Sequence, residues 1–388
     1  MASNSRKLSR LLGTDTKIGI EDVDATIPVG VQFYDNDAAL PADGGVVGAK
    51  AYTVSEAKFY FWNGDVWGPL DIAEWVYTPP PFVFQGSSYG FQVGGRRGYG
   101  SVEQYSFISD GNSVSIGNIS GGQDWWGWNS ASISSANNGY MVNDEHGGAV
   151  IIKFSFVADG FETSSTPSLT ATNGGHAGIS SGDTGYFGNG HSPSVLHKFT
   201  IASEAAGAVA VVAIPDDRTR AHGVSDTTNG AGYIGLGGYF QGASYNRIKK
   251  FSFANDNTLT TSNAASGLIT CAQGASSATS GYWIGGTDIA ANRYAPEPGY
   301  AYTNNIQKWP FATDTNAVAV ADLTYRLAFG ASSSSTANGY TAGNYRWGQG
   351  NNQFGIIQKF SFVTDTNATN IGNLTTARGN SSLSGFQV

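Results

Sequence analysis

Acidic residues recur along this chain at positions that could assemble a carboxylate cluster. Paired carboxylates are the groups that general acid–base chemistry, such as glycoside hydrolysis, requires. Each acid, however, belongs to a separate copy of one repeated unit, where an Asp side chain can bond the backbone N–H groups of its own turn. We therefore expect no enzymatic activity and interpret six residues as turn-forming scaffold: Asp110, Asp159, Glu204, Asp256, Asp314 and Asp365.

A second pattern that could belong to a catalytic site is the segment 181–186 (SGDTGY), which is similar to part of a sialidase aspartate box. The equivalent stretches of two other units, 135–140 and 277–282, lack the Asp. We therefore interpret Asp183 as a variable position of the repeat.

The histidines and the cysteine give no metal site. No pair has the spacing of zinc ligands among the five histidines, His146, His176, His191, His197 and His222. Cys271, the only cysteine, lies in the apolar run 268–272, so we expect a small buried side chain and not a nucleophile. Its position also argues against a copper radical site, in which a cysteine is cross-linked to a tyrosine. The sequence predicts neither a metal nor a cofactor.

The charge excludes some partners. With 21 basic and 29 acidic residues, the net charge is −8, so the chain lacks the cationic excess that neutralises nucleic-acid phosphates. No apolar run reaches the length of a bilayer-crossing helix. The basic residues near the start are not followed by the apolar core of a signal peptide. We expect no nucleic-acid partner and no membrane insertion.

One unit is repeated six times. Each copy contains a Gly-aromatic pair, an apolar stretch, a loop, a Lys-Phe-Ser-Phe element or a near copy, and one of the acids. The period is about 50 residues, as in arrays of one supersecondary unit. The Lys-Phe-Ser-Phe elements begin at Gln104, Lys153, Lys198, Lys250, Lys308 and Lys359. The Gly-aromatic pairs begin at Gly90, Gly139, Gly185, Gly232, Gly281 and Gly339, and a seventh, Gly385-Phe386, closes the chain.

The composition favours strands and tight turns. Gly accounts for 53 residues, and aromatic and charged residues for 13% each. Aromatic side chains pack on pleated sheets, and Gly and Asn allow turns. Four strand-sized pieces fit each period: a, the Ser-rich stretch; b, the Gly-aromatic strand; c, the Lys-Phe-Ser-Phe strand; and d, the strand after the acid. Since successive strands are antiparallel, the a–b and c–d turns share one edge, the turn face. The b–c and d–a connections share the other, the loop face.

The two ends of the repeat region are alike. Residues 89–93 (YGFQV) are echoed by 384–388 (SGFQV). An incomplete terminal unit favours a ring over a solenoid, because strands from both ends can complete one sheet and leave no open edge. We therefore predict an all-β propeller over residues 85–388, with six blades, or seven with one blade shared by both chain ends.

The fifth unit resembles a kelch repeat. Its pattern consists of 281–286 (GYWIGG), 306–311 (IQKWPF), Asp314, Leu323 and Arg326. Kelch blades have an apolar strand ending in Gly-Gly, an aromatic strand, an acidic turn and often an Arg before the next inner strand. Several other copies here lack the Gly-Gly pair. The resemblance implies a kelch-like propeller that binds partners through its loop face.

Residues 1–84 differ from the repeats. We expect an N-terminal attachment segment over 1–28, a small β-hairpin module over 29–76, and a Pro-rich linker over 77–84. The hairpin follows from Asn63-Gly64 between aromatic stretches, since this dipeptide favours the tightest turns. The attachment segment has one apolar helix face, formed by Leu8, Leu11 and Leu12.

This leader resembles the N-terminal regions of structural proteins from tailed bacteriophages. In that family a short N-terminal part attaches to the virion, and a larger β-rich part projects outward. The resemblance implies a location in the virion, with other tail proteins as partners of the attachment segment.

Aromatic and Arg side chains gather in the loop-face connections, where the repeats vary in length. Such groups stack on sugars and form protein hot spots. Alternatively, they pack the loops onto the sheets or face a neighbouring subunit. We name as candidate ligand-binding residues Arg96, Arg97, Tyr99, Trp125, Trp126, Trp128, Tyr239, Phe240, Tyr245, Arg293, Tyr294, Tyr300, Tyr302, Arg326, Tyr345, Arg346 and Trp347.

The resulting hypothesis is a non-enzymatic bacteriophage tail fibre or receptor-binding protein that recognises a host surface glycan or protein. One alternative is a purely structural collar, baseplate or decoration protein whose loops contact other virion proteins. A third is a glycan-cleaving enzyme. A homo-oligomer is compatible with each role.

Overall fold

In the computed structural model the chain divides into two compact units, residues 1–81 and 82–388. The structure describes residues 31–42, 49–55, 58–62, 65–70, 84–94, 101–118, 131–142, 151–156, 160–162, 169, 177–188, 195–201, 207–214, 221–235, 246–267, 269–288, 301–328, 330–344, 354–375 and 384–387. The predicted attachment residues Leu8, Leu11 and Leu12 lie outside these ranges. Within the ranges, no helical segment combines the length and hydropathy of a membrane span.

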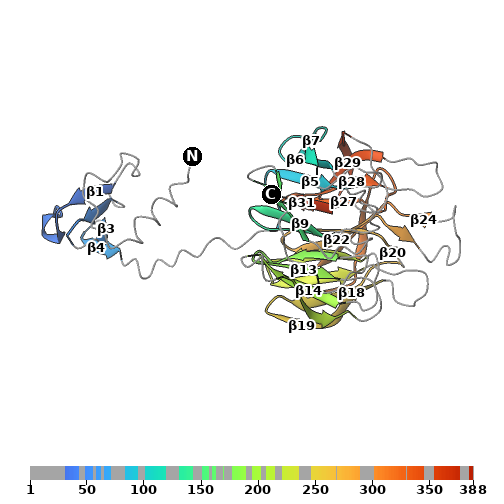
Figure 1. The fold of residues 1–388 in the computed structure, drawn as a ribbon, viewed down its shortest axis with the longest axis horizontal. Helices are drawn as coiled ribbons and strands as arrows, with labels where there is room; N and C mark the ends of the chain where they lie inside the picture. Colours follow the sequence, from blue (N-terminus) through green and yellow to red (C-terminus); the bar gives the residue numbers. More distant parts are fainter. Residues whose placement is uncertain are drawn as a thin grey trace. The chain divides into compact units, whose positions relative to one another are not determined.

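The described part of the first unit is a four-stranded sheet, drawn in blue in Figure 1. Its strands are β1 (Val31–Tyr34), β2 (Lys50–Thr53), β3 (Lys58–Trp62) and β4 (Trp67–Leu70), with β1 parallel to β2 and the other pairs antiparallel. Between β1 and β2 lies the short 3-10 helix η2 (Asp37–Ala39), capped by the Asn36 side chain. β3 and β4 flank the predicted Asn-Gly turn, and the rings of Trp62 and Trp67 lie 5.5 Å apart.

The described residues of the second unit form six four-stranded antiparallel sheets, numbered here in chain order (Figure 1). Sheet 1 contains β31 (Ser384–Gln387), β5 (Tyr89–Val93), β6 (Ser101–Ser106) and β7 (Val114–Asn118). Sheet 2 contains β8 (Ala131–Ser134), β9 (Asn138–Val142), β10 (Ile151–Ser155) and β11 (Gly160–Glu162). Sheet 3 contains β12 (Ala177–Ser180), β13 (Thr184–Gly188), β14 (Val195–Thr200) and β15 (Val209–Ala213).

Sheet 4 contains β16 (His222–Asp226), β17 (Ala231–Gly235), β18 (Arg247–Ser252) and β19 (Asn255–Ala264). Sheet 5 contains β21 (Gln273–Ser276), β22 (Ser280–Ile284), β25 (Asn305–Pro310) and β26 (Val318–Asp322). Sheet 6 contains β27 (Ala331–Ser334), β28 (Asn338–Asn344), β29 (Phe354–Ser361) and β30 (Thr369–Asn373). The prediction of an all-β chain built from small antiparallel sheets is confirmed.

The last strand of the chain completes sheet 1. β31 pairs antiparallel with β5, with Phe386 opposite Phe91. The two ends of the repeat region therefore share one sheet. The sequence of 384–388 is like that of 89–93, which forms a b strand. In the structure, however, β31 lies next to β5 as the a strand of sheet 1.

The a strands of neighbouring sheets lie beside one another. β8 lies beside β12, β12 beside β16, β16 beside β21, β21 beside β27, β27 beside β31, and β31 beside β8. Hydrogen bonds run from strand to strand: the Gln387 N–H donates to Ser134 Oγ at 3.2 Å. The Ser134 N–H donates to Ser180 Oγ at 2.9 Å, and the Ser180 N–H to Ser225 Oγ at 2.9 Å.

The aromatic residue of each Gly-aromatic pair packs against the c strand of the next sheet. Tyr233 of sheet 4 stacks on Phe311 of sheet 5 at a centroid distance of 5.3 Å and meets Trp309 edge-on at 5.7 Å. Between sheet 6 and sheet 1, Tyr340 stacks on Phe107 at 4.5 Å. The same packing occurs at Phe91, Tyr186 and Tyr282. Each such ring pair contributes about 0.5–1.5 kcal/mol beyond its buried area.

At Gly90, Gly232, Gly281 and Gly339 the glycine of the pair is required by a ring within the same sheet. A Cβ on Gly281 would lie 2.2 Å from the Trp309 indole, and one on Gly339 would lie 2.3 Å from the Phe360 ring. The c-strand ring therefore covers the bare backbone of the b strand. This contact explains why Gly and an aromatic residue recur together.

A lysine and an acid join neighbouring sheets. Lys250 Nζ of sheet 4 lies 2.7 Å from one carboxylate oxygen of Asp314 in sheet 5, and the Tyr233 hydroxyl donates to the other oxygen at 2.8 Å. Equivalent ion pairs of 2.6–2.7 Å are Lys198–Asp256, Lys308–Asp365 and Lys359–Asp110, the last between sheet 6 and sheet 1. The interpretation of the acids as residues of their own turns is therefore incomplete, because these four bind the preceding sheet.

An asparagine two residues after the acid adds a second link. Asn316 Oδ1 accepts a hydrogen bond from the Ala264 N–H of sheet 4 at 3.0 Å, and the Ala317 N–H donates to the Ala264 carbonyl at 2.8 Å. The equivalent bonds are Asp322 N–H to Asn367 Oδ1 and Asn373 N–H to Asn112 Oδ1, both 2.9 Å. We call the recurring Lys–Asp pair, together with the Tyr and Asn hydrogen bonds at the joints that have them, the inter-sheet clasp.

Replacement of Asp314 tests the clasp. Asp314→Asn retains a residue that tolerates the left-handed φ of 48° but removes the charge that binds Lys250. We expect the free energy of unfolding to fall by about 1–2 kcal/mol. Asp314→Ala should cost about 1 kcal/mol more, because Ala disfavours that backbone conformation.

Urea unfolding measures both variants. The matched control is Asp183→Asn in the exposed turn between β12 and β13, where we expect no change. An Asp314→Asn variant as stable as the wild type would contradict a stabilising clasp.

Candidate functional site: the inner-strand cavity and the loop face

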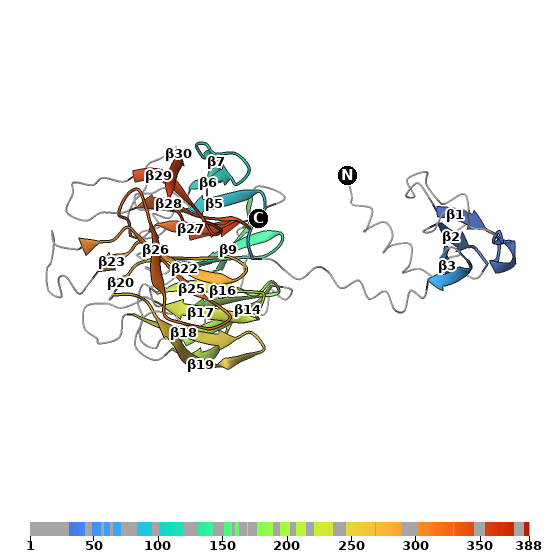
Figure 2. The ribbon, with the colours of Figure 1, turned by 180° about the vertical axis from the view of Figure 1, so that it is seen from behind.

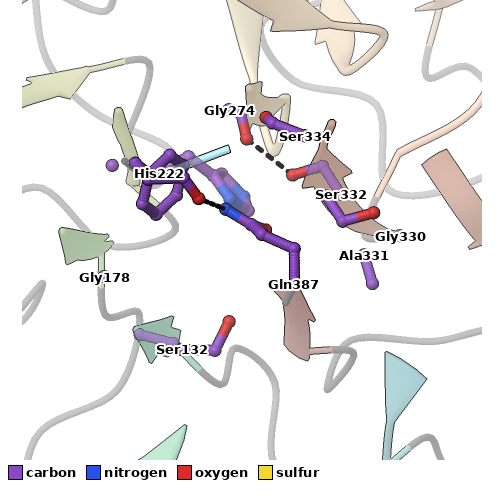
Figure 3. Close-up of a pocket in the computed structure, with 13 residues that line it drawn as sticks. Ser132, Gly178, His222, Gly274, Gly330, Ala331, Ser332, Ser334 and Gln387 are labelled. Carbon is purple, nitrogen blue, oxygen red and sulfur yellow. Dashed lines mark hydrogen bonds between the residues drawn. The ribbon is translucent and has the colours of Figure 1, made fainter. Parts of the chain in front are cut away.

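The a strands enclose a polar cavity of about 60 Å³ (Figure 3). Each of the six a strands lines it, through residues that include Ser132, Gly178, His222, Gly274, Ser332 and Gln387. This volume holds a few water molecules. Pockets for organic ligands have about 300–1,000 Å³. The cavity is therefore too small for a sugar.

Glycine allows the close approach of the a strands. A Cβ on Gly178 would lie 2.1 Å from the Ser132 carbonyl oxygen, and one on Gly223 would lie 2.1 Å from the Gly178 carbonyl oxygen. The Ser332 hydroxyl donates to the Gly274 carbonyl at 2.6 Å (Figure 3). Because these backbones nearly touch, no larger side chain fits between them, and the cavity stays narrow.

His222 is the one titratable side chain in the described lining of the cavity. It is half-buried, and burial lowers the pKa of its imidazole to about 4. The ring is therefore neutral at pH 7 and carries one hydrogen-bond donor and one acceptor. No carboxylate or thiol stands beside it among the described lining residues. The cavity thus offers no acid–base pair there.

The chain enters the second unit at the turn face. Gln387 Nε2 donates to the Phe84 carbonyl at 2.9 Å, as Figure 3 shows. Gln85 Nε2 donates to the Ser276 carbonyl at 3.0 Å. The Gly86 N–H donates to the carbonyl of Ser334 at 2.8 Å. Gln387, Ser276 and Ser334 end their a strands, next to the a–b turns, so this entry segment is anchored on the turn face.

The sequence predicts ligand-binding residues in the loop-face connections. Two of them are described: Arg326 is exposed, whereas Tyr302 is only 8% exposed. The others lie outside the described residues: Arg96, Arg97, Tyr99, Trp125, Trp126, Trp128, Tyr239, Phe240, Tyr245, Arg293, Tyr294, Tyr300, Tyr345, Arg346 and Trp347.

An additional three-stranded sheet stands on the loop face of sheet 5. β23 (Thr287–Asp288) pairs antiparallel with β20 (Ile269–Thr270) and β24 (Ala301–Tyr302). Gly285 and Gly286 precede it with φ of 61° and 107°, and the Gly286 N–H donates to the Leu327 carbonyl at 2.7 Å. In Figures 1 and 2, β20 lies at the opposite end of the second unit from the C-terminus. We call this element the loop-face sheet.

Cys271 directly follows β20 and is buried, as the sequence predicts. It is 1% exposed and packs with Tyr302 and Ala328. Its φ of 57° is a conformation that residues other than glycine rarely adopt. The thiol and the Tyr302 ring thus belong to the small core of the loop-face sheet.

Tyr325 lies on the loop face but was not among the sequence candidates. Its side chain is 44% exposed, next to exposed Arg326. The sequence pattern that marks Tyr325 is an aromatic residue directly before an Arg in a d–a connection. The Lys–Asp pairs were also not predicted, although the Lys and the Asp each recur in five of the six repeats.

No group of three or more His, Cys, Asp or Glu residues that could hold a metal occurs in the described ranges. His197 is buried in β14, and burial lowers the pKa of its imidazole. His146, His176 and His191 lie outside the described residues.

Comparison with known proteins informs the fold only. No protein-family model matches the chain, and no curated protein matches it. The chain is similar to a solved structure titled "Structure of YjhT", with 12% sequence identity, over 69% of this chain and 92% of that chain, at a TM-score of 0.50. At this identity the likeness concerns the fold, an all-β array of small sheets.

The low pKa of His222 predicts a pH-dependent stability. Its pKa is about 4 in the folded protein, against 6.5 for an unperturbed imidazole. Between these values the unfolded chain binds more protons, so the free energy of unfolding rises with pH across this window. His222→Gln should remove about 1–3 kcal/mol of that rise. Urea unfolding of both proteins at pH 4.5 and 7 measures the difference, and an identical pH dependence would contradict the low pKa.

Proposed function

We propose that residues 82–388 form a six-bladed, kelch-like β-propeller whose first blade is shared by both chain ends. Three observations support a closed ring. Each a strand lies beside the next, with β31 beside β8. The Lys–Asp pair of the inter-sheet clasp occurs between sheets 3 and 4, 4 and 5, and 5 and 6, and again, as Lys359–Asp110, between sheet 6 and sheet 1. The β31–β5 pairing brings the end of the chain into the sheet that begins the array.

We propose that this propeller is a recognition module that binds through its loop face. The observation that carries the proposal is the difference between the two faces. The turn face holds the repeated clasps and the entry segment 84–86, whereas the loop face holds the non-repeating connections and the loop-face sheet. Since the chain enters at the turn face, the loop face is the one left for an external partner.

In this proposal the protein is a non-enzymatic tail fibre or receptor-binding component of a bacteriophage particle. The attachment segment, with Leu8, Leu11 and Leu12, binds other virion proteins, and the loop face binds a glycan or protein on the host surface. Support comes from the resemblance of the leader to phage structural proteins and from the aromatic and Arg content of the loop-face connections.

Binding of the full chain to host cells and to their purified envelope polysaccharide tests the role. Replacement of Trp125, Trp126 and Trp347 by Ala should weaken binding at least about 10-fold, because large aromatic side chains carry most of the energy of such contacts. Circular dichroism and the unfolding temperature verify that the fold persists. The control is Tyr89→Ala at the turn-face end of β5, which should leave binding unchanged.

An image of the assembled particle separates the alternatives. A loop face covered by other virion proteins would contradict the receptor role and support a collar, baseplate or decoration protein. Release of reducing ends from the host polysaccharide would contradict the non-enzymatic role.

A further inference from the structure

We infer that Tyr325 and Arg326 form a subsite that binds an acidic sugar residue, such as a uronic acid, within a polysaccharide. The inference rests on the proposed recognition role of the loop face. Both side chains are exposed, in the d–a connection between sheets 5 and 6.

The two residues are presented between buried anchors. Leu323 before them and Leu327 after them are both buried in the core between sheets 5 and 6. The Leu323 N–H donates to the Asn304 carbonyl at 2.7 Å, and the Leu327 carbonyl accepts from the Gly286 N–H at 2.7 Å. The connection is therefore bonded at both ends to the segments that flank the loop-face sheet.

The backbone between the anchors is also held. Gln358, buried next to the β-bulge of β29, accepts hydrogen bonds at Oε1 from the Thr324 N–H at 2.8 Å and the Thr324 hydroxyl at 2.7 Å. The same oxygen accepts from the Tyr325 N–H at 3.3 Å. A side chain on a fixed backbone loses less conformational entropy when a ligand binds. The pair is thus preorganised.

The equivalent connection between sheets 4 and 5 indicates that the scaffold does not require the aromatic ring. There Gln307 takes the place of Gln358, and its Oε1 accepts from the Ser266 N–H at 2.8 Å. The residue that corresponds to Tyr325 is Gly267, which has no side chain. The hydrogen bond from this Gln to the d–a connection therefore forms without an aromatic residue at the next position.

The chemistry of the pair fits an acidic sugar. A tyrosine ring offers an apolar face on which the C–H groups of a pyranose can stack, and its hydroxyl can bond a sugar hydroxyl. The Arg guanidinium binds a carboxylate through two parallel hydrogen bonds. Among the ion pairs within the described residues, none uses Arg326.

A sugar fits this surface better than a protein does. The neighbouring residues Thr303, Asn304 and Thr324 are polar, and Asp288 of the loop-face sheet is half-buried. A protein hot spot needs an aromatic anchor enclosed by a ring of contacts that excludes water. One exposed ring beside one cation matches a single charged sugar residue instead.

Affinity measurements with defined oligosaccharides test the subsite. The probes are oligomers of galacturonate, glucuronate, mannuronate and guluronate, with neutral oligomers of glucose and galactose for comparison. The full wild-type chain should bind at least one acidic oligomer more tightly than every neutral one. Arg326→Gln should weaken that binding about 10-fold or more and abolish its dependence on ionic strength. Tyr325→Ala should weaken it about 10-fold, whereas Tyr325→Phe should retain most of it.

The matched control is Tyr89→Ala, because Tyr89 is 41% exposed against 44% for Tyr325 but lies at the turn-face end of β5. Its affinity should equal that of the wild type. All three substituted side chains are exposed, so unfolding temperatures should stay within a few degrees of the wild-type value.

Five results would overturn the inference. The first is a wild-type chain that binds no acidic oligomer, and the second is unchanged affinity in Arg326→Gln. The third is host-cell binding that resists removal of surface polysaccharide and is lost after protease treatment, which assigns the surface to a protein partner. The fourth is host binding that is lost in the Trp125, Trp126 and Trp347 variant but kept in both Tyr325→Ala and Arg326→Gln. This result rejects the subsite and leaves the recognition role intact. The fifth, absence of all host binding, rejects both.

Discussion

The inter-sheet clasp is the interaction on which the second unit depends. A four-stranded sheet with strands of this length buries too little apolar surface to be stable alone, so each sheet needs neighbours on its faces. The stacked rings, such as Tyr233 on Phe311, supply the buried apolar contact, and the Lys250–Asp314 pair sets how far one sheet lies from the next. Removal of one charge would leave its partner partly buried and unpaired. The free-energy cost of that unpaired charge favours the one arrangement of neighbouring sheets in which Lys250 and Asp314 meet.

The clasp engages four of the six repeated acids, Asp110, Asp256, Asp314 and Asp365. The two carboxylate oxygens of Asp314 accept hydrogen bonds from Lys250 and Tyr233 of the preceding sheet. Burial, followed by the bond to Asp314, raises the pKa of Tyr233, so the phenol stays protonated and remains a donor. Each group of the clasp thus serves the joint between sheets. The c–d turns that hold these four acids lie on the turn face.

The sequence allowed the strands to be predicted but not their partners in neighbouring sheets. The pairs Gly281-Tyr282 and Lys308-Trp309 fall in β22 and β25, because alternating burial leaves a periodic pattern. The Lys250–Asp314 contact spans 64 residues, and spacing within one repeat does not tell which copy supplies the partner. The short strands of the loop-face sheet have no periodicity to detect. The hydrogen bond from the Tyr325 N–H to Gln358 joins residues 33 positions apart, so the sequence does not reveal how the backbone of Tyr325 is held.

We propose that the array closes into a ring through its last strand. Deletion of residues 384–388 removes β31, which pairs with β5 and lies beside β8 and β27. Urea unfolding combined with amide hydrogen exchange measures the effect. If the ring closes, the second unit should lose at least about 3 kcal/mol of unfolding free energy in one cooperative transition. Faster exchange should then extend to the amides of β8 and β27. An unchanged transition, with faster exchange confined to β5, would contradict closure.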